Sequence, residues 1–73
     1  MGMKKPILFK FAKRVRAERK KLKLSQEDFA EVAGFHRTYI GMIERAEKNI
    51  TLANIEKLAK ALRLSISALL KGL

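Results

Sequence analysis

The feature that most constrains the fold is the spacing of small and apolar residues over residues 26–45. Ala30 is small enough to let two short helices approach closely where they cross, and Gly34 can adopt the left-handed conformation of a sharp turn. The apolar side chains expected on their shared inner side are Phe29, Ala33, Phe35, Ile40 and Ile43. The spacing therefore predicts two crossed helices joined by a tight turn, with the outer face of the second helix left free.

Helical periodicity extends over the rest of the chain, and no run of residues alternates with the period of two that is typical of a strand. The expected helices run from Pro6 to near Leu22, from the N-cap Ser25 to Gly34, from Arg37 to about Arg45, from the cap Thr51 to Leu62, and over a short segment after the cap Ser65. The sequence thus predicts a compact all-α domain of five helices.

The chain has 73 residues, enough for one domain with a small core worth about 3–5 kcal/mol. It has no Cys, which excludes disulfides and thiolate metal sites, and His36 is its single His, so we expect no metal and no cofactor. We assign residues 1–7 to a basic N-terminal arm and residues 8–73 to the domain. Self-association would add the burial that a small core lacks.

The charge of the chain is large and unevenly distributed. The 17 Lys and Arg residues and the 7 Asp and Glu residues give a net charge of +10. Residues 1–24 contain ten basic residues and one acidic residue, a net +9, whereas residues 25–73 contain seven and six, a net +1. This balance favours a polyanionic partner, first nucleic acid and next an anionic membrane surface. No segment approaches the roughly 20 apolar residues of a membrane span or the pattern of a signal peptide, so we expect a cytoplasmic protein.

Three motifs carry a resemblance to a known family: LSQEDFA at 24–30, YI at 39–40 and IER at 43–45. Together they resemble the signature of the Cro/C1-type, or XRE, family of helix-turn-helix proteins, over roughly residues 8–72. Within that family, residues 37–40 and 43–45 with Asn49 and Thr51 most resemble the controller proteins of restriction–modification systems. The resemblance implies a lambda-repressor-like fold with its helix-turn-helix unit at 26–45, binding to double-stranded DNA at the nucleoid, and regulation of transcription.

The first turn of the third helix carries the residues expected to read DNA bases, because this end of such a helix points at base edges in the major groove. Arg37 can donate two hydrogen bonds to a guanine, and Thr38 can offer its hydroxyl or touch a thymine methyl group. The resemblance implies base contacts at both positions, and the alternative is an ordinary solvated first turn. Met42, one turn further, can only make apolar contacts with bases or fill the groove.

A second group of polar residues is expected at the DNA backbone. Ser25 and Gln26 begin the second helix, where N–H groups and the positive end of the helix dipole favour phosphate. The resemblance puts a phosphate contact on Gln26, whereas Ser25 also caps the helix. The residues after the third helix that resemble backbone-clamping positions are Arg45, Lys48, Asn49 and Thr51. Tyr39 can either pack inward or direct its hydroxyl at phosphate or base.

Other polar residues are assigned to the scaffold or to long-range attraction. The resemblance implies an internal ion pair between Arg19 and Glu44. We interpret His36 as a helix cap or phosphate neighbour rather than a metal ligand or a catalytic base. For the basic first helix we favour general electrostatic attraction to DNA. The alternative is an arm on the DNA backbone formed by Lys4, Lys5 and Lys10.

The end of the chain carries more apolar side chains than a short fifth helix needs: Ile66, Leu69, Leu70 and Leu73. They can complete the core or meet their symmetry mates, and the resemblance implies dimers formed near the fifth helix. We therefore predict a homodimeric, sequence-specific regulator of transcription that reads a roughly palindromic operator with half-sites about 34 Å apart. The alternatives are an antitoxin that binds a toxin as well as DNA and, less favoured, a basic membrane-surface binder. No arrangement of residues supports an enzyme.

Overall fold

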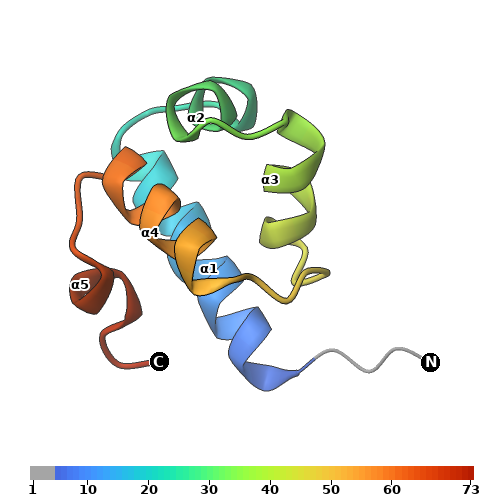
Figure 1. The fold of residues 1–73 in the computed structure, drawn as a ribbon, viewed down its shortest axis with the longest axis vertical. Helices are drawn as coiled ribbons and strands as arrows, with labels where there is room; N and C mark the ends of the chain where they lie inside the picture. Colours follow the sequence, from blue (N-terminus) through green and yellow to red (C-terminus); the bar gives the residue numbers. More distant parts are fainter. Residues whose placement is uncertain (1–4) are drawn as a thin grey trace.

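The computed structural model describes residues 5–73, which form five α-helices (Figure 1). The helices are α1 (Pro6–Lys21), α2 (Gln26–Ala33), α3 (Arg37–Glu44), α4 (Leu52–Ala61) and α5 (Ile66–Leu70). Residues 5–73 contain no strand, so the predicted all-α fold with five helices is confirmed. The helix ends expected near Leu22 and Arg45 lie one residue earlier.

The helices are arranged so that α3 and α5 occupy different sides of the molecule. α2 contacts both α3 and α4, and α1 contacts both α3 and α5. Figure 1 shows α1 and α4 lying between α3 and α5. The outer surface of α3 and the surface around α5 are therefore two separate faces, each available for a different interaction.

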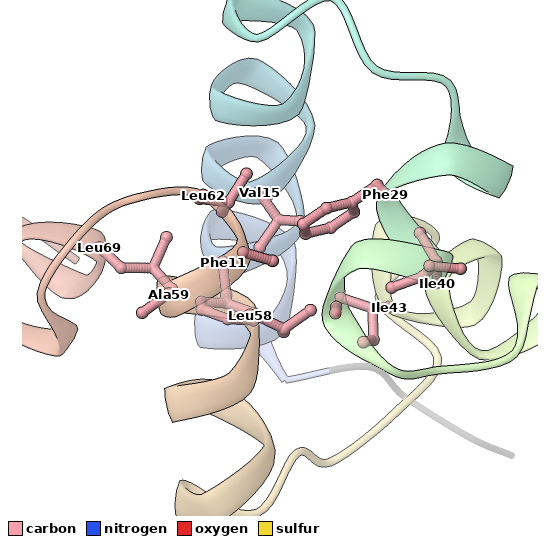
Figure 2. Packing of buried hydrophobic residues seen from close by; sticks show 12 residues of the cluster. Phe11, Val15, Phe29, Ile40, Ile43, Leu58, Ala59, Leu62 and Leu69 are labelled. Carbon is pink, nitrogen blue, oxygen red and sulfur yellow. The ribbon is translucent and has the colours of Figure 1, made fainter.

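The hydrophobic core lies where the helices converge, and Figure 2 shows how its side chains point toward one another. Its largest fully buried side chains are Val15, Phe29, Ile40, Ile43, Leu58 and Leu69. The inner side predicted for the two crossed helices is confirmed, because Phe29, Ala33, Ile40 and Ile43 are buried and Phe35 is partly buried against the core. Ala30 is also buried, as a close approach between α2 and its neighbours requires.

The turn between α2 and α3 is fixed by local backbone and capping contacts. Gly34 has a φ of +80°, the left-handed conformation predicted for it, and the Phe35 N–H donates to the Ala30 carbonyl at 2.8 Å. His36 then caps α3, with Nδ1 accepting a hydrogen bond from the Thr38 N–H at 3.1 Å. The capping interpretation of His36 is thus confirmed, and the cap sets where the first turn of α3 begins.

The C-terminal apolar residues divide between the core and the surface. Leu69 is 0% exposed and packs within its own monomer, so of the two roles expected for these residues it takes the core one and leaves no surface for a dimer interface. A helix of five residues depends on tertiary packing, and the buried Leu69 side chain supplies part of that packing for α5. Ile66, Leu70 and Leu73 are only partly buried and retain surface for a partner.

Candidate nucleic-acid interface

The first turn of α3 presents the residues predicted to read bases. Arg37 and Thr38 are both exposed, while Ile40 and Ile43 of the same helix turn into the core. Met42 is half-buried, one turn after Thr38 on the same side of the helix. α3 thus buries one side and leaves its N-terminal end and outer side open to a groove.

Residues from both helices of the 26–45 unit meet at a shallow hollow of about 190 Å³. Its lining residues are Gln26, Arg37, Thr38, Gly41 and Arg45. The start of α2, the start of α3 and the residue that follows α3, Arg45, therefore face the same space. The structure brings two predicted base-reading residues and two predicted backbone-contacting residues onto one surface.

Gly41 leaves room for the Arg45 side chain against α3. A Cβ atom at position 41 would stand 3.0 Å from Arg45 Nη1, so the guanidinium lies directly over the bare backbone of α3. Arg45 Nε is also 3.2 Å from the Glu47 carboxylate. The glycine that weakens α3 as a helix thus allows a cation to lie along its outer surface.

A buried ion pair supports this surface from behind. Arg19 of α1 donates from Nε to Glu44 Oε2 at 2.7 Å and from Nη2 to Glu44 Oε1 at 3.0 Å, which confirms the predicted pair. Arg16 adds a bond from Nη2 to the Glu44 carbonyl at 3.0 Å. Burial alone would raise the pKa of Glu44, but the hydrogen bonds from Arg19 and Gln26 and the positive charges of Arg19 and Arg16 lower it. Glu44 is therefore held ionised, and α1 is fixed to the end of α3.

Gln26 takes part in the same network. Its amide Nε2 donates to Glu44 Oε1 at 3.1 Å, which directs this nitrogen inward. The predicted phosphate contact of Gln26 therefore falls to its remaining Nε2–H or to the backbone N–H groups at the start of α2. Ser25, just before it, accepts a hydrogen bond from the Asp28 N–H at 3.0 Å, so its capping role is confirmed.

Tyr39 is oriented by contacts within the domain. Its ring lies 4.8 Å from the Phe35 ring, and its hydroxyl accepts a hydrogen bond from Asn54 Nδ2 at 3.0 Å. Lys48 places Nζ 5.8 Å from the centre of the same ring. The Tyr39 ring thus packs inward and its hydroxyl connects α3 to α4. Because the hydroxyl accepts in the bond with Asn54, its own O–H stays a donor for a phosphate.

The loop after α3 carries the other residues predicted at the DNA backbone. Asn49 and Thr51 are exposed and Lys48 is half-buried. Thr51 also caps α4 by accepting a hydrogen bond from the Asn54 N–H at 3.1 Å. Tyr39, Lys48 and Thr51 are therefore linked through shared contacts, and the loop is held against α3 and α4.

Sequence reasoning missed two residues of this region. Arg16 precedes Arg19 by three residues, so the two side chains lie on the same face of α1. This spacing could have indicated that Arg16 also lies near the Glu44 carboxylate, at 3.6 Å. Asn54 had no such signal, since nothing in the sequence connects the first turn of α4 with the Tyr39 hydroxyl.

The basic first helix packs one side against the core and exposes the lysines of the proposed arm that the structure describes. α1 begins at Pro6, as expected for the first helix, so the last two residues assigned to the arm, Pro6 and Ile7, lie in its first turn. Lys5 and Lys10 are exposed, whereas Lys4 and the rest of residues 1–4 lie outside the described part of the chain. The apolar stripe of α1, including Phe11, Ala12 and Val15, is buried in the core and is not available to a membrane surface. Within residues 5–73, no helix is long and apolar enough to cross a membrane.

Comparison with known proteins identifies the family. Residues 15–69 match the family model described as helix-turn-helix. The chain belongs to the helix-turn-helix family. The resemblance predicted from the motifs at 24–30, 39–40 and 43–45 is therefore confirmed.

Its relatives include controller proteins and repressors. Control protein C.SmaI of Serratia marcescens is 52% identical over 59 residues, which cover 81% of this chain and 70% of the relative. Control protein C.BamHI of Bacillus amyloliquefaciens is 49% identical over 53 residues, covering 71% of this chain and 65% of the relative. The likeness to controller proteins is thus confirmed as well.

Solved structures show the same architecture. The restriction–modification controller protein C.AhdI of Aeromonas hydrophila superposes with a TM-score of 0.81 at 44% identity, covering 85% of this chain and 90% of that one. The DNA-binding domain of the P22 C2 repressor superposes with a TM-score of 0.80 at 39% identity, covering 85% and 82%. The family match, these relatives and these structures confirm the prediction of a sequence-specific DNA-binding regulator. Family membership also agrees with the prediction that the chain is not an enzyme. The residues that touch DNA, the homodimer and the palindromic operator stay predictions.

Proposed function

We propose that this helix-turn-helix protein regulates transcription as a homodimer that places α3 of each subunit in the major groove of a roughly palindromic operator. The observation that carries the proposal is the surface where Arg37, Thr38, Gln26 and Arg45 face one hollow. Such a surface combines donors for base edges with donors for the phosphates beside them. Binding to DNA would place the protein at the nucleoid in the cytoplasm.

The residues divide into two kinds of contact. Arg37 and Thr38 read base edges from the exposed first turn of α3, and Met42 makes apolar contacts one turn further. The residues proposed to contact the DNA backbone are Ser25, Gln26, Tyr39, Arg45, Lys48, Asn49 and Thr51. Tyr39 also orients Lys48 through its ring, so the two act together. Backbone contacts set the register of α3, and base contacts select the sequence.

The dimer is proposed to form around α5, through Ile66, Leu70 and Leu73. α5 and α3 lie on different sides of the molecule (Figure 1), so a two-fold axis near α5 would separate the two copies of α3. The longest dimensions of the monomer, 32 Å and 26 Å, are compatible with reading helices about 34 Å apart, one turn of DNA.

Selection of bound sequences from a random DNA pool at near-physiological salt tests the proposal. We expect enrichment of a palindromic consensus whose half-sites are centred about one helical turn, roughly 10 base pairs, apart. A consensus with a single half-site would contradict the dimer, and the absence of any enrichment would contradict sequence-specific reading. Sedimentation of the protein with the selected DNA then gives the number of subunits bound.

A further inference from the structure

The fifth helix is too short to be stable by itself. α5 has five residues, and isolated helices shorter than about 12–15 residues are marginal in water. The last carbonyl groups of any helix also lack partners within the helix. The position of α5 must therefore be set by contacts with the rest of the domain.

Arg14 of α1 supplies such contacts at the C-terminal end of α5. Its Nη1 donates to the Leu69 carbonyl at 2.9 Å, and its Nη2 donates to the Lys71 carbonyl at 2.8 Å. A longer bond of 3.4 Å joins Nη1 to the Ala68 carbonyl. The guanidinium satisfies carbonyls that the helix leaves unpaired, and its positive charge lies at the negative end of the helix dipole.

The segment held in this way carries side chains of the expected dimer surface. Leu70 follows Leu69, whose carbonyl Arg14 binds, and Leu73 lies two residues after Lys71. The Leu73 N–H donates back to the Leu70 carbonyl at 3.1 Å, which closes the end of the chain into a turn. Leu70 and Leu73 then form part of the wall of a largely apolar groove of about 430 Å³. The other lining residues are Ile7, Leu8, Phe11, Asn49, Ile50 and Ile55.

We propose that Arg14 is a positioning residue for dimerisation, which holds residues 66–73 against α1 so that Ile66, Leu70 and Leu73 form one surface for a second copy of the chain. The inference rests on the proposed homodimer. Arg14 makes no contact with the partner in this scheme, and it acts through the backbone of α5. A lysine could replace it only in part, because one ammonium group lacks the planar fork that spans two carbonyls.

The experiment compares the wild type with Arg14→Ala, Arg14→Lys and the control Lys13→Ala by sedimentation equilibrium. Lys13 is the adjacent exposed cation of α1, so its removal subtracts the same charge. We expect Arg14→Ala to raise the dimer dissociation constant about tenfold or more, the effect of losing a hydrogen bond to a charged group. The dissociation constant of Arg14→Lys should lie between those of the wild type and Arg14→Ala, and that of Lys13→Ala should match the wild type. Circular dichroism defines a temperature at which every variant is folded.

Amide hydrogen exchange provides a second measurement that does not depend on the dimer contact itself. In the monomeric state at low concentration, Arg14→Ala should speed exchange of the Leu69 and Leu70 amides relative to the amides of α4. Uniformly faster exchange in all helices would show general destabilisation and overturn the role of Arg14.

The possible outcomes separate the two proposals. A wild-type protein that stays monomeric up to millimolar concentration would overturn the homodimer, and with it this role of Arg14. A wild-type dimer whose dissociation constant is unchanged by Arg14→Ala would overturn the role of Arg14 alone.

Discussion

Arg19 and Glu44 form a buried, two-bond ion pair that fixes α1 to the end of the helix proposed to read DNA. The two bonds measure 2.7 Å and 3.0 Å, and the Glu44 side chain is 0% exposed while that of Arg19 is 11% exposed. Gln26 and Arg16 complete the shell around the carboxylate. The position of α3 relative to the rest of the domain therefore depends on the buried Glu44 carboxylate. Its negative charge is stabilised by the hydrogen bonds and positive charges of the residues around it.

Removal of Arg19 should strongly destabilise the fold. Arg19→Met leaves the Glu44 carboxylate buried without its main partner, and breaking a buried pair costs about 3–5 kcal/mol. Because Gln26 and Arg16 remain, we expect a loss near the lower end, about 3 kcal/mol, in the free energy of unfolding measured with urea. Lys21→Ala is the control, since its exposed pair with Glu18 at 3.1 Å should contribute less than about 1 kcal/mol. Equal losses for the two variants would contradict a special role of the buried pair.

The same carboxylate predicts how stability depends on pH. The pKa of Glu44 is lower in the folded protein than its ordinary value, because the Arg19 and Gln26 hydrogen bonds and nearby positive charges outweigh burial. The unfolded chain therefore binds the proton more readily, so the contribution of Glu44 is fully present above the unfolded pKa and is lost as pH falls through the folded pKa. Urea unfolding between about pH 6 and pH 3 should show a smaller loss of stability for Glu44→Gln than for the wild type. Identical pH profiles would show that Glu44 does not titrate with folding.

Substitution of Arg37 should change which DNA is bound. Arg37→Ala removes an exposed donor from the first turn of α3 and should cost about 1–3 kcal/mol on the selected operator, with little change on random DNA. Titration of both DNAs under the same salt conditions measures the ratio of the affinity for the operator to the affinity for random DNA. Equal losses on the two DNAs would assign Arg37 to the phosphate backbone instead.

Substitution of Lys48 should weaken binding without changing sequence preference. Lys48 lies beside the Tyr39 ring in the loop after α3, where it is proposed to contact phosphate. Lys48→Ala should lower affinity for operator and random DNA alike and reduce the slope of log affinity against log salt by about 0.9. The control Lys60→Ala removes an exposed charge from α4 and should leave the slope near that of the wild type. A slope that Lys48→Ala leaves unchanged would contradict the phosphate contact.

Much of the fold could be predicted because it depends on neighbours along the chain. Ser25 and Thr51 cap helices through N–H groups three residues away, and Gly34 takes the left-handed turn that follows α2. The burial of Phe29 and Ile40 followed from helical spacing alone. Each of these features is encoded within a few residues, so the sequence carries it directly.

The roles of the cations could not be predicted in the same way. Arg14, Arg16 and Arg19 belong to one basic helix, and composition treats them alike as part of the net charge of +9 over residues 1–24. In the folded chain, Arg14 binds the carbonyls of α5, and Arg16 and Arg19 bind Glu44. Three of the charges that suggested attraction to DNA thus also make contacts that hold the helices together.

The sequence by itself determined that this chain forms five helices around a helix-turn-helix unit, because helical period, caps and turn residues are local. Its motifs at 24–30, 39–40 and 43–45 also carried the resemblance to a family of DNA-binding regulators. Only the tertiary structure decided that Leu69 is core rather than interface, that Gln26 faces Glu44, and that Tyr39 bonds to Asn54. Each of these depends on which helix faces which at distances of a few ångströms. Such contacts join residues far apart in the chain, and they are fixed only when the whole core packs.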